Sequence, residues 1–121
     1  EGMPVMGTCA GCVLLAKEGD EEMRRTGTRP LSLMDMAVER NAFGRQRESF
    51  EAILEVEDRP FQAVFIRAPA ITKVWNDCKP LAFFNEKIVM ARQDNLLALA
   101  FHPELSNDTR MHRMLLEIIR P

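Results

Sequence analysis

Three residues of this sequence belong to the types that cleave amides: Cys9, His102 and Glu104. A cysteine thiol becomes a useful nucleophile when a base removes its proton, and histidine is the side chain that most often does so. A carboxylate beside the histidine can hold the imidazole in the required tautomer. Only Pro103 separates His102 from Glu104. The three residues together predict a cysteine-dependent amide hydrolase in which Cys9 attacks, His102 carries protons and Glu104 orients His102.

Cys9 requires a sharp turn between a strand and a helix. Residues 4–8 form a short apolar run that predicts a buried strand, and residues 10–17 are apolar at helical spacing. The stretch 7–11 (GTCAG) therefore predicts a nucleophile elbow, whose neighbouring residues must be small. At such an elbow the helix N-terminus favours the thiolate, and the N–H of Ala10 can point at an oxyanion. A buried structural cysteine is the alternative interpretation.

His102 follows residues 96–101, which predict a strand. A histidine at the end of a strand can lie at the sheet edge that carries the elbow, although a surface histidine beside a turn proline is the simpler alternative. His112 provides a contrast, because it lies among polar neighbours in the last expected helix, where we expect it to be exposed. The combination with Cys9 and Glu104 favours the catalytic interpretation of His102.

The rest of the sequence predicts one α/β domain over residues 1–121 with a strand-rich middle. We expect a polar loop at 19–30 and a final helix at 108–119, begun by Asn107 or Asp108 as a cap. Further strands are expected at 31–40, 49–57, 61–66, 81–84 and 88–92, with turns at 58–60, 85–87 and 93–95.

Cys9 and Cys12 also form a C-x-x-C motif, which at a helix start is typical of a dithiol redox site. Zinc is disfavoured, because there is no second C-x-x-C motif and the two histidines are far apart in the sequence. Cys12 can instead pack as a small apolar residue. A Cys9–Cys12 disulfide would block the nucleophile, so oxidants are expected to inhibit through this pair.

Composition excludes several other classes of protein. The chain has 121 residues, 46% hydrophobic and 28% charged, with a net charge of -2. That balance gives no electrostatic reason to expect a nucleic acid or a membrane surface as partner, and no apolar run is long enough to span a bilayer. The cysteine count of three is odd and low, which favours a reducing compartment, the cytoplasm. A cysteine nucleophile with a histidine base needs no metal or organic cofactor.

Several motifs resemble a known family. Residues 7–11 (GTCAG) and 101–105 (FHPEL) resemble the class I glutamine amidotransferases. The stretch 38–46 (VERNAFGRQ), followed by 49–51 (SFE) and 64–69 (VFIRAP), resembles the glutaminase subunit of pyridoxal 5'-phosphate synthase. The resemblance runs essentially from end to end, and residues 38–46 are its specific part.

The resemblance implies a flavodoxin-like α/β fold and a defined reaction. Cys9 would attack the side-chain amide of L-glutamine, and the ammonia would pass to a synthase subunit that builds the vitamin B6 cofactor. Pyridoxal phosphate would then be a product of the partner complex, with no role as a cofactor of this chain. The resemblance further implies that Arg40, Ile66 and Arg67 bind glutamine, with arginine suited to a carboxylate.

One expectation concerns what the sequence lacks. Family members carry an upstream segment with the first strands of the sheet and a Gly-Gly-Glu-Ser-type loop that completes the oxyanion hole, and these 121 residues contain no match to it. Because Glu1 falls just before the nucleophile strand, we expect the C-terminal part of a longer chain, weakly active or inactive alone. A catalytically incomplete interaction fragment is therefore an alternative, alongside the C-x-x-C redox protein.

Overall fold

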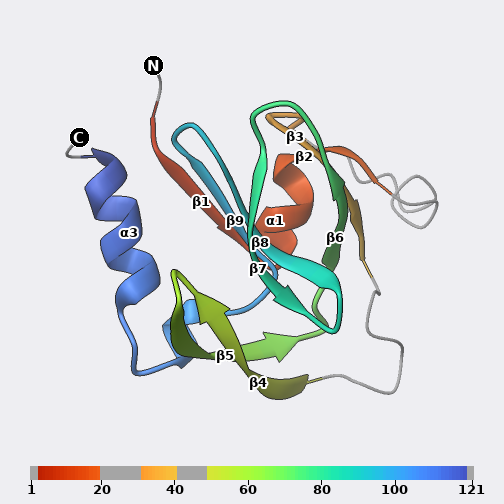
Figure 1. The fold of residues 1–121 in the computed structure, drawn as a ribbon. Helices are drawn as coiled ribbons and strands as arrows, with labels where there is room; N and C mark the ends of the chain where they lie inside the picture. The colour runs from red at the N-terminus through yellow and green to blue at the C-terminus, as the bar shows by residue number, and fades with distance from the viewer. Residues whose placement is uncertain (1–2, 20–30, 41–48, 120–121) are drawn as a thin grey trace.

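The computed structural model describes residues 3–19, 31–40 and 49–119. Within them, a seven-stranded sheet has the order β1-β9-β8-β6-β3-β2, with β7 paired to β8 beside this path (Figure 1). The β1–β9 and β2–β3 pairs are parallel, and the others are antiparallel. The strands are β1 Val5–Thr8, β2 Ala16–Glu18, β3 Met34–Glu39, β6 Ala70–Val74, β7 Lys79–Phe84, β8 Lys87–Gln93 and β9 Leu96–Leu99.

A separate antiparallel hairpin consists of β4 (Ser49–Val56) and β5 (Arg59–Ile66). Along most of both strands, exposed residues alternate with buried or half-buried ones. This pattern is expected for a hairpin that covers a hydrophobic core with one face. The helical elements are α1 (Ala10–Leu15), the short 3₁₀ helix η1 (Pro103–Leu105) and α3 (Arg110–Ile119). Figure 1 shows α3 beside the hairpin and α1 among the strands of the large sheet.

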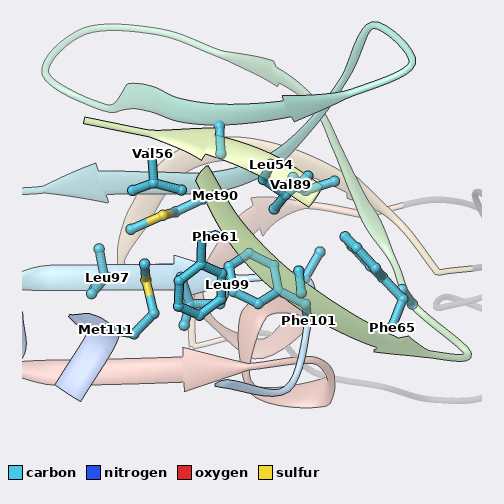
Figure 2. Close-up of a cluster of buried hydrophobic side chains, with 14 of the residues drawn as sticks. Leu54, Val56, Phe61, Phe65, Val89, Met90, Leu97, Leu99, Phe101 and Met111 are labelled. Atoms are coloured by element: carbon cyan, nitrogen blue, oxygen red, sulfur yellow. The ribbon is translucent and has the colours of Figure 1, made fainter. Parts of the chain in front are cut away.

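The large sheet separates two hydrophobic clusters. Along β9, Leu97 and Leu99 belong to the cluster under the hairpin, whereas Ala98 between them belongs to the cluster around α1. This alternation follows from the two-residue period of a strand. Figure 2 shows the hairpin cluster, where Met111 of α3 lies near Leu97.

Three phenylalanines form the centre of the hairpin cluster, and each is almost fully buried. The ring of Phe101 lies 5.7 Å from that of Phe61 and 5.6 Å from that of Phe65, the second pair edge to face. Aromatic pairs at such distances add to the free energy of area burial. Because Phe101 precedes His102, these contacts fix the backbone at the start of the candidate site.

The elbow also packs tightly against β1. A Cβ added at Gly7 would lie 2.7 Å from the carbonyl oxygen of Gly11 and 2.8 Å from the Leu15 side chain. Only glycine therefore allows this approach of strand and helix. The argument that both flanking positions must be small holds here for Gly7, whereas no atom of the described residues lies within 4 Å of a Cβ added at Gly11.

The structure confirms the strands expected at 4–8, 31–40, 49–57, 61–66, 81–84, 88–92 and 96–101, within a few residues. The helix expected at 10–17 ends at Leu15, because the chain continues as β2 and pairs with β3. The turn expected at 58–60 is shorter, since Pro60 pairs with Glu55 inside the hairpin. Strand β6 was not predicted from the sequence, and the loop expected at 19–30 lies, apart from Gly19, outside the described residues.

The predicted C-terminal helix is confirmed with its cap. The Arg110 backbone N–H donates to Oδ1 of Asp108 at 2.9 Å, which satisfies one of the free amides at the helix start. Met111 and Met114 are buried and His112 is exposed, as the helical spacing predicts. Among the described residues, no helix is long and apolar enough to cross a membrane.

Candidate functional site

Cys9 occupies the sharp turn between β1 and α1, as predicted. Its backbone has φ 55° and ψ -107°, a conformation that residues other than glycine rarely adopt. The Cys9 N–H donates to the Leu99 carbonyl at 2.8 Å, and the Cys9 carbonyl accepts from Val13 N–H at 3.3 Å. These bonds hold the strained turn between the end of β9 and the first turn of α1.

His102 and Glu104 are in direct contact. Nδ1 of His102 lies 2.8 Å from Oε2 of Glu104, and Pro103 between them begins η1. Burial has the largest single effect on the Glu104 carboxyl and raises its pKa, but the hydrogen bond with His102, a backbone hydrogen bond and the nearby histidines together bring the net pKa below the usual value. A carboxylate on Nδ1 leaves Nε2 as the imidazole nitrogen that can exchange protons with a substrate.

Strand β5 connects the nucleophile to the histidine. The Val64 carbonyl accepts from the His102 N–H at 2.8 Å, and the Ile66 carbonyl accepts from the Cys9 thiol at 3.2 Å. Both carbonyls, of Val64 and Ile66, therefore belong to the C-terminal end of β5. The sequence did not reveal this role of β5, because any residue type can supply a backbone carbonyl.

The electrostatics of Cys9 differ from the expectation of a stabilised thiolate. Burial raises the pKa of the Cys9 thiol, and the negative charge of Glu104 adds to this rise. A hydrogen bond from the Ala10 N–H acts in the opposite direction but does not outweigh burial. The helix N-terminus therefore favours the thiolate through the Ala10 N–H, as expected, but the removal of the sulfur from water has the larger effect in this conformation.

A pocket of about 450 Å³ opens beside the thiol. Its lining combines apolar side chains with two arginines: Cys9, Ala10, Val13, Leu14, Arg40, Ile66, Arg67 and Pro69. The predicted oxyanion donor and all three predicted substrate-binding residues therefore share one cavity with the nucleophile. His102 and Glu104 are not part of this lining; the backbone of His102 is bonded to β5, and Glu104 contacts His102.

Residues 41–46 belong to the stretch 38–46 that carries the specific part of the resemblance, and they lie outside the described residues. Within the described part of the chain, no group of three or more histidine, cysteine, aspartate or glutamate side chains is arranged to hold a metal ion.

The three cysteines are free, and Cys12 and Cys78 are buried. Burial raises the pKa of the Cys12 thiol to about 12, so this thiol stays protonated at neutral pH. Cys12 packs in the cluster around α1, as the simpler interpretation expected. Its 0% exposure disfavours a dithiol site that meets outside substrates.

Comparisons with known proteins agree with the resemblance found in the motifs. The profile described as the SNO glutamine amidotransferase family matches residues 1–120. A relative from Archaeoglobus fulgidus, named pyridoxal 5'-phosphate synthase subunit PdxT, is 59% identical over 98% of this chain and 60% of its own length. A protein of the same name from Staphylothermus marinus is 56% identical, over 98% of this chain and 62% of its own length.

The fold has a close match among solved structures. A crystal structure described as a glutamine amidotransferase superimposes with a TM-score of 0.86 at 44% sequence identity, over 96% of this chain and 60% of the other. The chain thus spans about 60% of the length of these proteins. The similarity supports the flavodoxin-like class I amidotransferase fold expected from the sequence.

Proposed function

Because this chain belongs to the SNO glutamine amidotransferase family, we propose that it provides the Cys9, His102 and Glu104 triad of a glutaminase. The reaction converts L-glutamine to glutamate and ammonia. The observation that carries this proposal is the shared attachment to β5, which holds Cys9 through Ile66 and His102 through Val64. The Cys9 thiol and the His102 backbone are thereby both held at the same end of β5, which supports the proposal.

The steps follow from the types of the residues. His102 accepts the thiol proton as the Cys9 sulfur attacks the amide carbon, and the resulting oxyanion accepts a hydrogen bond from Ala10 N–H. His102 then returns the proton to the departing ammonia, which leaves a thioester on Cys9. His102 next removes a proton from water, which hydrolyses the thioester to glutamate, and the thiol is regenerated. Glu104 stabilises the imidazolium that forms in both halves.

Glutamine binding is assigned to the pocket beside Cys9. Arg40 and Arg67 line it, and a guanidinium can hold a carboxylate with paired hydrogen bonds. Ile66 supplies backbone groups and an apolar wall to the same cavity. We assign the amino-acid end of glutamine to these residues and the side-chain amide to Cys9.

The destination of the ammonia follows from the relatives. Proteins at 59% and 56% identity are named as subunits of pyridoxal 5'-phosphate synthase. We therefore propose a synthase subunit as partner, with ammonia delivered for vitamin B6 synthesis. The free cysteines are consistent with a reducing compartment, and we place the protein in the cytoplasm.

The test is ammonia release from glutamine by the chain, with and without a synthase subunit from a relative. Cys9→Ala is the control, because it removes the nucleophile and leaves the rest of the pocket in place. Release that depends on Cys9 supports the proposal. A third arm adds to this chain the segment of a relative that lies outside the matched region. If ammonia is released only in the third arm, the chain alone is catalytically incomplete. If no ammonia is released in any arm, the glutaminase proposal is wrong.

A further inference from the structure

The contact between Cys9 and β5 has an unusual polarity for a nucleophile. The thiol donates to the Ile66 carbonyl oxygen at 3.2 Å, and a carbonyl oxygen can only accept. The contact therefore requires the protonated sulfur and opposes the thiolate, which is the reactive form. If the proposed function is right, this arrangement represents a resting state of the site.

The next residue after that carbonyl has a strained backbone. Arg67 has φ 46°, in the left-handed region that favours glycine. Several other residues with positive φ, such as Asp58, Asn85 and Asp94, lie in hairpin turns that call for it, whereas Ser32 and Asn76 do not. Arg67 instead lies at a bend after the last residue of β5, where no hairpin turn requires the strain.

A single rotation connects these two observations. Turning the peptide plane between Ile66 and Arg67 exchanges the directions of its carbonyl and its N–H, and it changes ψ of Ile66 together with φ of Arg67. The rotation carries φ of Arg67 from a positive to a negative value, which L-residues adopt more readily. Both side chains are exposed, so the rotation moves no buried side chain.

We propose that the Ile66–Arg67 peptide is a two-state positioning element for Cys9. With the carbonyl toward the sulfur, it holds the resting thiol. After rotation, it presents the Arg67 N–H to the thiolate, alongside the Ala10 N–H. Because Ile66 and Arg67 also line the pocket, a bound substrate contacts the element that controls the nucleophile. The proposal deepens the glutaminase proposal and depends on Cys9 as its nucleophile.

The electrostatics of the site agree with this arrangement. Burial raises the pKa of the Cys9 thiol in the present conformation, and the Ala10 N–H alone does not offset the effect. A second N–H donor in place of an acceptor would favour the thiolate further. The rotation therefore converts a group that opposes ionisation into one that supports it.

Two variants at position 67 test the proposal. Arg67→Gly and Arg67→Ala both remove the guanidinium, and they differ mainly in their tolerance of positive φ. The measurement is the rate at which iodoacetamide alkylates Cys9 between pH 6 and pH 10, followed by intact mass, without synthase or glutamine. In this step a C–S bond forms as iodide leaves, and the thiol proton passes to solvent. Buried Cys12 and Cys78 contribute little, and Cys9→Ala measures their background.

Glycine stabilises the resting orientation, so Arg67→Gly should react more slowly than Arg67→Ala by about fivefold at neutral pH. Arg67→Asn should lie between them, because asparagine tolerates the left-handed region better than alanine. Equal rates, or a faster glycine variant, would overturn the two-state element. The readout needs no turnover: a rate difference in a protein that releases no ammonia would keep this proposal and remove only the glutaminase assignment.

Discussion

Nδ1 of His102 and Oε2 of Glu104 lie 2.8 Å apart, across a single proline. The contact pairs an imidazole N–H with a carboxylate whose burial raises its pKa, and this hydrogen bond is the largest of several effects that together lower the net pKa below the usual value. The carboxylate therefore remains charged at neutral pH, as the orienting role requires. The rigid Pro103 linkage leaves few other positions for the carboxylate.

Glu104→Gln should reduce ammonia release by roughly 10²- to 10⁴-fold, because the amide keeps the shape and loses the charge that stabilises the imidazolium. The loss should appear in kcat, since Glu104 does not line the pocket beside Cys9 to which glutamine is assigned. Glu86→Gln, in the exposed β7–β8 turn, is the matched control and should retain activity. The assay is steady-state ammonia release in the most active form found. A Glu104→Gln variant as active as wild type would remove Glu104 from the triad.

Gly7→Ala should destabilise the fold by about 1–3 kcal/mol, because the added methyl group meets the Gly11 carbonyl oxygen and the Leu15 side chain. Gly11→Ala has open space around it in the described part of the chain and lies inside α1. It should stabilise the protein by about 0.5–1 kcal/mol through helix propensity. Urea unfolding of the two variants measures both effects. The interpretation fails if the two substitutions shift stability in the same direction.

Cys12→Ala separates the hydrolase from the C-x-x-C redox protein. Because Cys12 is fully buried and packs around α1, the variant should lose about 1 kcal/mol of stability and keep the proposed glutaminase activity. A dithiol oxidoreductase would lose its activity completely. The measurements are ammonia release and insulin disulfide reduction for wild type and variant. Reduction of insulin that depends on both Cys9 and Cys12 would favour the redox function.

The sequence could predict much of this architecture from local patterns. The period-2 alternation of residues 49–57 predicted β4, and the helical spacing near Met111 and Met114 predicted α3. Strand β6 has no such pattern of its own. It is defined by antiparallel pairing with β3, more than thirty residues earlier in the chain, and this contact leaves no local signal.

The sequence also predicted part of the candidate site. Cys9, His102 and Glu104 were predicted as catalytic residues because their types and spacing suit one kind of chemistry. The carbonyls of Val64 and Ile66 were not found as contacts, because a backbone carbonyl is present at every residue. The raised pKa of the Cys9 thiol was also missed, since it depends on burial by parts of the chain distant in sequence.

Arg110 should be important for stability because it joins α3 to the hairpin. Its guanidinium donates to the Val56 carbonyl at 3.1 Å and to the Pro60 carbonyl at 2.5 Å, and it lies 5.3 Å from the centre of the Phe61 ring. Arg110→Ala should cost roughly 2–4 kcal/mol, since two carbonyls lose a charged donor. Arg113→Ala, on the exposed face of the same helix, should cost less than about 0.5 kcal/mol. Urea unfolding compares them, and equal costs would contradict this role.

Asp35 should make the stability of the sheet depend on pH. The hydrogen bond from Lys17, at 2.5 Å, lowers the pKa of its carboxyl, and Gln93 adds a second contact at 3.1 Å. A carboxyl whose pKa is lower in the folded state stabilises the fold above its unfolded pKa. This contribution is lost as pH falls through the folded value. The free energy of unfolding should therefore decrease more between pH 5 and pH 2.5 in wild type than in Asp35→Asn. Chemical unfolding at each pH measures the difference, and parallel curves would show that the Lys17–Asp35 pair contributes no pH-dependent stability.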